Sequence, residues 1–327
     1  MKIEHSVVIT AHNRKKYLLN AVESVLNSNV ERNTFEIIVV KNFMDEIIDT
    51  ELLKHGVSAI YTEEVSFGKK LSIGVENSNG KIVSFLDDDD LFTPNKLKRV
   101  MDIFTNYHDA VFLHNNIIKI DENNSRTENQ SEFGKGTVSI YSSESSSKNW
   151  GAALSQRADW YVSCISIRTE FAKDITEYLK ESSRSLDKVI FLLASSSSKK
   201  IAVCDDKLTY YRKHESLTGV KASSKDFRES RYLFTKQSID TINEIQKKGG
   251  IEENIPLVLI LNKLQCNLLI YEKGNRMRAI RKALNLHKDV METKNREIRI
   301  LSLLLITKFF SPTIAFRIFK FYQVRDI

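Results

Sequence analysis

The sequence is poor in the residues that build linkers, disulfide frameworks and membrane spans. Only 3 prolines and 11 glycines occur in 327 residues, which leaves little material for flexible linkers. The three cysteines, Cys164, Cys204 and Cys266, lie far apart within apolar runs, so we expect buried thiols rather than a disulfide framework or a zinc site. The longest uncharged apolar stretch is too short to cross a bilayer. With no secretory signal before the first strand, these absences predict a cytoplasmic protein.

Positive charge is concentrated in the C-terminal third of the chain. The formal net charge is +7, from 49 Lys and Arg against 42 Asp and Glu. Residues 226–327 hold 19 of the basic residues and 11 of the acidic ones, a net charge of +8, whereas the preceding 225 residues hold 30 and 31. This asymmetry indicates an anionic partner for the C-terminal part, either a membrane surface or a nucleic acid.

Apolar runs alternate with helical patterns through the first part of the sequence. The runs of strand length are residues 6–11, 35–40, 57–61 and 82–86. Helical spacing of apolar or amphipathic residues is found between them, in residues 17–26, 46–54 and 69–77. Strands and helices that alternate in this way predict an α/β domain with a mostly parallel sheet and right-handed crossovers. Because the pattern is helical from residue 227 onward, we expect the α/β domain over residues 1–222 and a helical region over residues 223–327.

Four consecutive acids, Asp87 to Asp90, follow the apolar run 82–86, and Pro94 comes shortly after them. In an open α/β sheet, ligands bind at the carboxyl ends of the strands. Carboxylates this close repel one another, and burying them unpaired costs several kcal/mol each. Hard oxygen ligands suit Mg²⁺ or Mn²⁺, so one interpretation is a metal site. The other is a solvated acidic turn that caps a helix over residues 95–105.

Five segments, taken in order, carry a resemblance to a known family. Residues 6–14 look like an opening strand and turn that hold a nucleotide, and residues 80–90 look like a metal-binding Asp-x-Asp segment. Residues 162–168 look like the strand before an acceptor region, Asp187 falls where that family carries a catalytic base, and residues 208–218 are close to a segment ending in Tyr-Arg-x-His-x-x-Ser. The family that these segments resemble is the inverting glycosyltransferases of family 2, which have the GT-A fold. The resemblance covers residues 5–218, about two thirds of the chain.

The resemblance implies metal-dependent transfer of a sugar, by a single displacement with inversion, from a nucleotide-sugar donor to an acceptor hydroxyl. The acceptor would be a glycan or a lipid-linked molecule. Asp187 would be the catalytic base, although an acid in the first turn of a helix is also an ordinary helix cap. Asp89 and His214 would hold Mg²⁺ or Mn²⁺, although His214 also fits a surface histidine in a basic loop.

Other residues are implied in binding the nucleotide-sugar. They are Thr10, Ala11, Asn13, Arg14, Asn42, Lys70, Asp87, Asp88 and Arg212. For Lys70, as for Lys69 beside it, solvation at the surface is the alternative interpretation. Two departures from the family affect the nucleobase. Lys41 and Asn42 stand where the family usually has an aspartate, and residues 70–72 read Lys-Leu-Ser where it often has Ala-Arg-Asn, so the nucleotide is not predicted.

Two other functions stay open at this point. A sugar nucleotidyltransferase would need a glycine-rich phosphate loop after the first strand, and residues 11–14 contain no glycine. A catalytically silent binding module would instead act through the basic C-terminal region.

Residues 298–322 of that region alternate apolar clusters with Arg and Lys. One interpretation of this alternation is a helix that lies on an anionic membrane surface, here the inner face of the membrane. Packing on the catalytic domain, or on a second subunit of a homo-oligomer, is the alternative. The resemblance implies no nucleic-acid partner.

Overall fold

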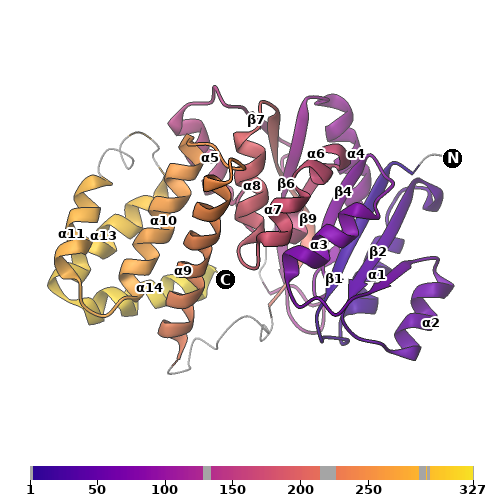
Figure 1. Cartoon of the computed structure of the whole chain (residues 1–327), viewed down its shortest axis with the longest axis horizontal. Helices are drawn as coiled ribbons and strands as arrows, with labels where there is room; N and C mark the ends of the chain where they lie inside the picture. The colour runs from indigo at the N-terminus through magenta and orange to yellow at the C-terminus, as the bar shows by residue number, and fades with distance from the viewer. Residues whose placement is uncertain (1–2, 128–133, 214–225, 287–291, 293–294, 327) are drawn as a thin grey trace. The chain divides into compact units, whose positions relative to one another are not determined.

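The computed structural model of the protein describes residues 3–127, 134–213, 226–286, 292 and 295–326 (Figure 1). These residues form two compact units. The first contains the chain up to residue 143 and residues 158–213, and the second contains residues 144–157 and the helices from Phe227 onward. The domain boundary predicted at residue 222 lies within residues 214–225, outside the described residues.

A sheet of nine strands, counted over the described residues, forms the centre of the first unit. Its strands are β1 (His5–Ala11), β2 (Phe35–Lys41), β3 (Ser58–Tyr61), β4 (Ile82–Asp87), β5 (Leu91–Phe92), β6 (Ala110–Ile120), β7 (Val138–Tyr141), β8 (Ile165–Arg168) and β9 (Lys200–Arg212). Their order is β3-β2-β1-β4-β8-β6-β9-β5, with β7 paired to β9. The first four strands are parallel to their neighbours within that group, and β8 runs antiparallel to both β4 and β6. The predicted α/β class is therefore confirmed.

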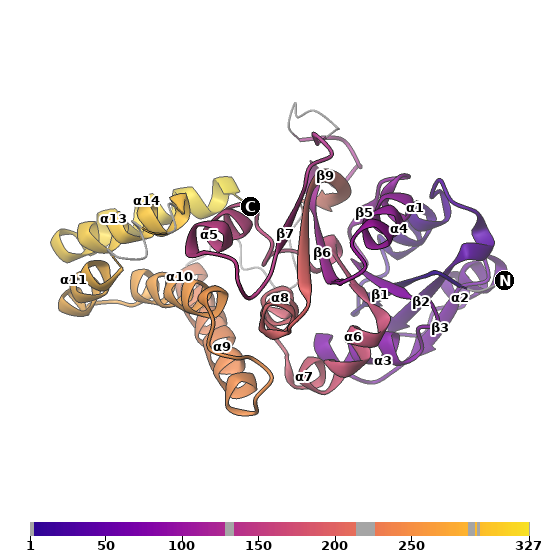
Figure 2. The same cartoon turned by 90° about the horizontal axis from the view of Figure 1, so that it is seen from above.

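Helices cover both faces of this sheet (Figure 2). They are α1 (Leu18–Leu26), α2 (Glu46–Lys54), α3 (Phe67–Glu76), α4 (Lys96–Asn106), α6 (Thr169–Asp174), α7 (Thr176–Glu181) and α8 (Leu186–Ser196), with 3-10 turns η1 (Arg32–Thr34) and η2 (Val162–Cys164). Successive side chains of β1 alternate between the two faces, as strand geometry requires. Val7 and Ile9 lie in one core cluster with residues of α1 and α4, whereas Val8 faces Gly74 of α3.

The second unit is helical, as predicted for the C-terminal region. Its helices are α5 (Ser147–Ser155), α9 (Phe227–Lys247), α10 (Ile255–Tyr271), α11 (Arg276–Asn285), α13 (Arg296–Phe310) and α14 (Pro312–Asp326). The Asn295 side chain caps α13 by accepting from the Ile298 amide at 3.1 Å, and its own amide donates to the Gly151 carbonyl at 3.1 Å. Residues 144–157 are joined to the C-terminal helices in this way. None of the described helices is both long and apolar enough to cross a lipid bilayer.

Helix α3 packs closely on strand β1 at Gly74. A methyl group added at this position would lie 2.2 Å from Val8 Cγ1, far inside the contact distance. We expect Gly74→Ala to lower the free energy of unfolding by about 1–3 kcal/mol through overpacking, as measured by urea denaturation. Adding Val8→Ala removes the obstructing methyl groups, so the double variant should lose less stability than the sum of the two single losses. Strictly additive losses would contradict the contact.

Candidate active site

The four acids lie at the carboxyl end of the central strand β4. Asp87 is the last residue of β4 and is in register with Thr10 near the end of β1, while Asp88 to Asp90 form the turn that leads into β5. Because β4 lies between β1 and β8, this turn opens at the middle of the sheet. That is the edge where open α/β sheets bind ligands.

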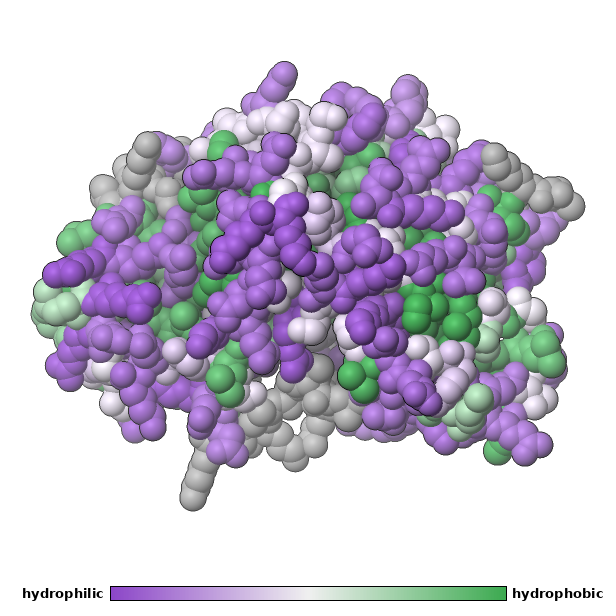
Figure 3. Space-filling model, in the orientation of Figure 1, coloured by the Kyte–Doolittle hydropathy of each residue, from purple (hydrophilic) through white to green (hydrophobic). Residues whose placement is uncertain are grey.

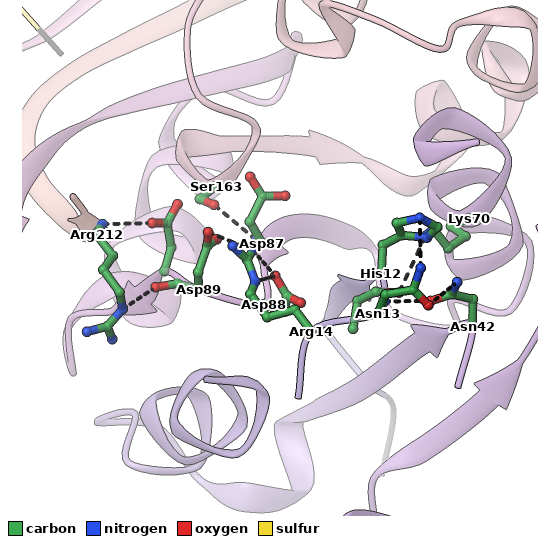
Figure 4. Close-up of polar contacts among 12 residues, drawn as sticks. His12, Asn13, Arg14, Asn42, Lys70, Asp87, Asp88, Asp89, Ser163 and Arg212 are labelled. Atoms are coloured by element: carbon green, nitrogen blue, oxygen red, sulfur yellow. Dashed lines mark hydrogen bonds and ion pairs between the residues drawn. The ribbon is translucent and has the colours of Figure 1, made fainter. Parts of the chain in front are cut away.

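Arg14, from the loop after β1, forms ion pairs with two of the acids, Asp88 and Asp89 (Figure 4). Its Nη2 lies 2.6 Å from Asp89 Oδ2, and its Nε donates to Asp88 Oδ1 at 3.1 Å. Nη2 also contacts Asp88 Oδ1. A guanidinium presents several donors in one plane, so it can bind two carboxylates at once. Arg14 thus offsets part of the negative charge of the turn.

Burial and crowding raise the pKa values of these acids. Burial first, and the Asp89 charge second, raise the pKa of Asp90 to about 7. Burial raises the pKa of Asp88 to about 6, against the opposing effect of Arg14. The pKa of Asp87 lies well above its ordinary value for the same reasons, burial and then the neighbouring acids.

The same acids fit a divalent cation. Asp87, Asp89 and Asp90 each offer a carboxylate oxygen, and these three atoms lie within 4.8 Å of one another. Asp88 Oδ2 is buried and has no hydrogen-bond partner among the described residues. An excess of buried negative charge with hard oxygen donors is the environment that Mg²⁺ and Mn²⁺ prefer. A second group, Cys204 to Asp206, is equally close-set, but Arg99 Nε lies 2.7 Å from Asp206 Oδ2 and compensates it.

Arg212 holds the acid turn from the end of β9. Its backbone amide donates to Asp90 Oδ1 at 2.9 Å, and its Nε donates to the Asp89 carbonyl at 2.7 Å (Figure 4). The guanidinium also lies 4.4 Å from the centre of the Tyr17 ring. Arg212 is therefore buried and fixes the backbone of the turn, rather than projecting freely. His214 lies outside the described residues.

The ends of β1 and β2 carry a pair of amides. Asn42 Oδ1 accepts from the Asn13 backbone amide at 2.8 Å, and Asn42 Nδ2 donates to Asn13 Oδ1 at 3.0 Å. Asn13 has a φ of +55°, in the left-handed region that Asn tolerates better than most residues. Lys41, beside Asn42, is buried and pairs with Asp49 of α2 at 2.8 Å.

Lys70 is buried beside this pair. It is 1% exposed, its Nζ lies 2.9 Å from His12 Nδ1, and burial lowers its pKa to about 8. Solvation at the surface is therefore the wrong interpretation for Lys70. Solvation at the surface is the right interpretation for Lys69, which is exposed and pairs with Glu64. Ala11, whose carbonyl lies 3.4 Å from Lys70 Nζ, and Thr10 are buried in β1.

Asp187 lies in the first turn of α8. Its Oδ2 accepts from the backbone amide of Tyr161 at 3.2 Å, and its Oδ1 accepts from the Lys188 amide at 2.9 Å. The Tyr161 ring in turn lies 4.3 Å from the ring of Tyr211, the residue before Arg212. Burial, with Tyr161 and the acids of the turn adding to it, raises the pKa of Tyr211 well above its ordinary value. The contact with Tyr161 shows that Asp187 does more than cap its own helix.

Sequence reasoning missed two residues that support the acid turn. Ser163 Oγ accepts from the Asp87 amide at 3.0 Å. The Lys96 ammonium is fully buried and donates to the Ser163 carbonyl at 2.6 Å, and burial lowers its pKa to about 7. The apolar spacing of α4 placed position 96 on the buried side of the helix, and a lysine there was the available signal.

Comparison with known proteins identifies the family. Residues 6–168 match the model of glycosyl transferase family 2, and they include all of β1 after His5, the acid turn and β8. The chain belongs to glycosyl transferase family 2. Poly(ribitol-phosphate) beta-N-acetylglucosaminyltransferase TarS of Staphylococcus aureus is 25% identical over 260 residues, which make up 76% of this chain and 43% of TarS. The matched part of this chain therefore spans less than half the length of TarS.

Solved structures agree on the fold. The crystal structure of TarS residues 1–349 has a TM-score of 0.55 at 16% identity, and its complex with UDP-GlcNAc has a TM-score of 0.56 at 17% identity. Each alignment covers 99% of this chain and 92% of the other. The expected GT-A fold with a helical C-terminal part is therefore confirmed for this family 2 member.

The raised pKa values predict how stability depends on pH. Between the ordinary carboxyl pKa and the raised values of Asp88, about 6, and Asp90, about 7, the folded protein holds protons that the unfolded chain releases. Without divalent cations, these two groups should therefore make stability fall as the pH rises from about 4 to about 7. Asp90→Asn removes one titrating group and keeps an oxygen for the Arg212 amide, so its thermal midpoint should fall less over this range. Asp240→Asn, at an exposed position of α9, is the control, and an Asp90→Asn profile parallel to the wild type would refute the assignment.

Proposed function

We propose that the protein is a metal-dependent inverting glycosyltransferase that moves a sugar from a nucleotide-sugar to an acceptor hydroxyl in a single displacement. One observation carries the proposal: a close-set group of carboxylates at the carboxyl end of β4 lies in the same unit as Asp187. Tyr161 contacts both Asp187 and the ring of Tyr211, and Tyr211 precedes Arg212, whose backbone amide binds the acid turn. Membership of family 2 supports it. Of the two runner-up functions, a sugar nucleotidyltransferase needs a glycine-rich loop after β1, and residues 11–14 contain no glycine. A catalytically silent binding module has no need of a close-set group of carboxylates in the same unit as Asp187.

The proposed reaction assigns separate roles to residues that would hold the metal ion and to the residue that would act as the base. Asp89, with Asp87 and Asp90 close to it and His214 as a further ligand, would hold Mg²⁺ or Mn²⁺. The bound ion would offset negative charge on the departing nucleoside diphosphate. Asp187 would take the proton of the acceptor hydroxyl. A general base of this kind contributes about 10²–10⁴-fold to the rate.

The remaining candidate residues would bind the nucleotide-sugar donor. Asn13 and Asn42 present paired amides at the ends of β1 and β2, and Lys70 brings a buried amine to the same edge. Together with Thr10, Ala11, Asp88 and Arg14, they would hold the nucleotide, while Arg212 would keep the acid turn in shape. UDP-GlcNAc is the first donor to test, because TarS has been solved with it. TarS acts on poly(ribitol-phosphate) by its name, so a polymeric or lipid-linked polyol phosphate is the first acceptor to test.

Two variants test the assigned roles. Asp187→Asn should lower the rate of UDP release in the presence of acceptor by about 10²–10⁴-fold and leave UDP-GlcNAc binding intact. Asp89→Ala should lose both the reaction and the Mn²⁺-dependent part of donor binding, as measured by calorimetry. Asp240→Asn, with an exposed carboxylate far along the chain, should behave as wild type.

Two outcomes would count against the proposal. A wild-type rate for Asp187→Asn would remove the base. Failure of a panel of nucleotide-sugars with Mn²⁺ to bind the wild-type protein would favour the silent binding module.

We also propose that the second unit contacts the inner face of the membrane. Leu303, Ile306 and Phe310 of α13 are exposed at helical spacing, and so are Ile314, Ile318 and Phe321 of α14. Exposed Arg299 and Arg317 accompany them. Hydrophobic residues are also visible among hydrophilic ones over the C-terminal helices in Figure 3. Apolar side chains beside arginines suit the interface of anionic lipid.

Vesicle sedimentation tests this contact. The protein should bind phosphatidylglycerol vesicles more tightly than phosphatidylcholine vesicles, and Leu303→Ser with Phe310→Ser should weaken binding about tenfold or more. Met277→Ser, on α11, replaces a side chain of similar exposure and should leave binding unchanged. If the protein does not bind vesicles and instead forms dimers in sedimentation velocity, the exposed apolar surface of α13 and α14 joins two copies of the chain.

A further inference from the structure

The first turn of α8 carries a buried lysine immediately after Asp187. Lys188 is 8% exposed. Its Nζ lies 3.7 Å from Asp187 Oδ2 and 3.8 Å from Asp159 Oδ2, so one ammonium faces two carboxylates. Neither the family resemblance nor the proposed reaction assigns Lys188 a role.

Three contacts fix the position of this ammonium. It donates to the Asp159 carbonyl at 3.3 Å, and it lies 4.9 Å from the centre of the Trp160 ring. The Asp159 side chain, which completes the set, is fully buried. A buried carboxylate strongly favours keeping a cation beside it, because an unpaired charge in the interior is costly. Lys188 is therefore held by residues 159 and 160 and cannot turn out into solvent as the exposed Lys69 does.

The segment that fixes Lys188 also binds Asp187 directly. Tyr161, the next residue, donates its backbone amide to Asp187 Oδ2 from a left-handed conformation with φ of +60°. His114 Nε2 lies 3.0 Å from the Trp160 carbonyl and braces the same segment against β6. Oδ2 of Asp187 thus faces a backbone amide and a fixed ammonium, while Oδ1 meets the Lys188 amide. These contacts define the plane of the carboxylate.

We propose that Lys188, anchored by Asp159 and Trp160, is a positioning residue that holds the Asp187 carboxylate in the orientation in which it takes the acceptor proton. The inference rests on the proposed function of Asp187 as the base. Lys188 itself touches neither donor nor acceptor in this account. Its loss should therefore slow the chemical step without weakening donor binding, since a misplacement of about 1 Å at a reacting group can cost about a hundredfold in rate.

The test compares variants in two backgrounds. Lys188→Met alone leaves the Asp159 carboxylate buried without its cation, so a second variant, Lys188→Met with Asp159→Asn, removes both charges and protects the fold. We expect both to lower kcat with UDP-GlcNAc about tenfold to a hundredfold and to leave the donor KM unchanged. Lys188→Arg keeps the charge and should retain most of the rate. In the Asp187→Asn background, the same changes should have no further effect, because there is no base left to position.

The outcomes separate this inference from the proposed function. Equal losses in the wild-type and Asp187→Asn backgrounds, or a wild-type kcat in the double variant, would overturn the role of Lys188 and leave Asp187 as the base. A wild-type rate for Asp187→Asn itself would overturn the base assignment, and with it the role of Lys188. A wild-type protein that turns over no nucleotide-sugar would overturn both.

Discussion

Repulsion among the buried carboxylates of the turn after β4 is the constraint on which the rest of the site depends. Asp88 and Asp90 are almost completely buried within four consecutive acids, and such a turn is stable only when other parts of the chain compensate it. The compensation comes from segments far apart in sequence: the Arg14 guanidinium after β1, the Arg212 amide at the end of β9, and Ser163 in η2, whose side-chain hydrogen bond lowers the pKa of Asp90. These residues reach the turn only when the strands that carry them have assembled into the sheet. The geometry of the site therefore depends on the whole fold of the first unit.

The sequence predicted the parallel half of the sheet well, because β1, β2 and β4 are almost continuously buried runs and helices follow the strands of this half. β3, which is mostly exposed, has the weakest strand pattern of the four. The run 82–86 matches β4, and the acids follow it as expected. It predicted the other half poorly. β9 spans Lys200–Arg212 and includes Asp205 to Lys207, whose polar side chains give no apolar strand pattern. Residues 162–164 form a 3-10 turn, so β8 starts later than the apolar pattern indicated.

Some residues of the candidate site could be predicted from the sequence, and others could not. Two separate segments, residues 6–14 and 80–90, contain Arg14 and the acids, and the resemblance selected Arg14 and Asp187. The partners of Asp187 could not be predicted, because Tyr161 lies 26 positions away and contacts it through a backbone amide, which no residue type encodes. Lys41 is a similar case. It stands where the family usually has an aspartate, but it pairs with Asp49 of α2, and the Asn42 amide contacts Asn13 instead.

A metal ion and a nucleoside diphosphate are expected to bind at the acid turn after β4. The most direct measurement is a crystal structure of the protein soaked with Mn²⁺ and UDP, with anomalous data collected for manganese. An anomalous peak within coordination distance of an Asp89 carboxylate oxygen, about 2–2.5 Å, with the diphosphate on its far side, is the predicted result. A peak elsewhere, or a UDP bound with Asp89 still paired to Arg14 and no manganese beside it, would contradict it.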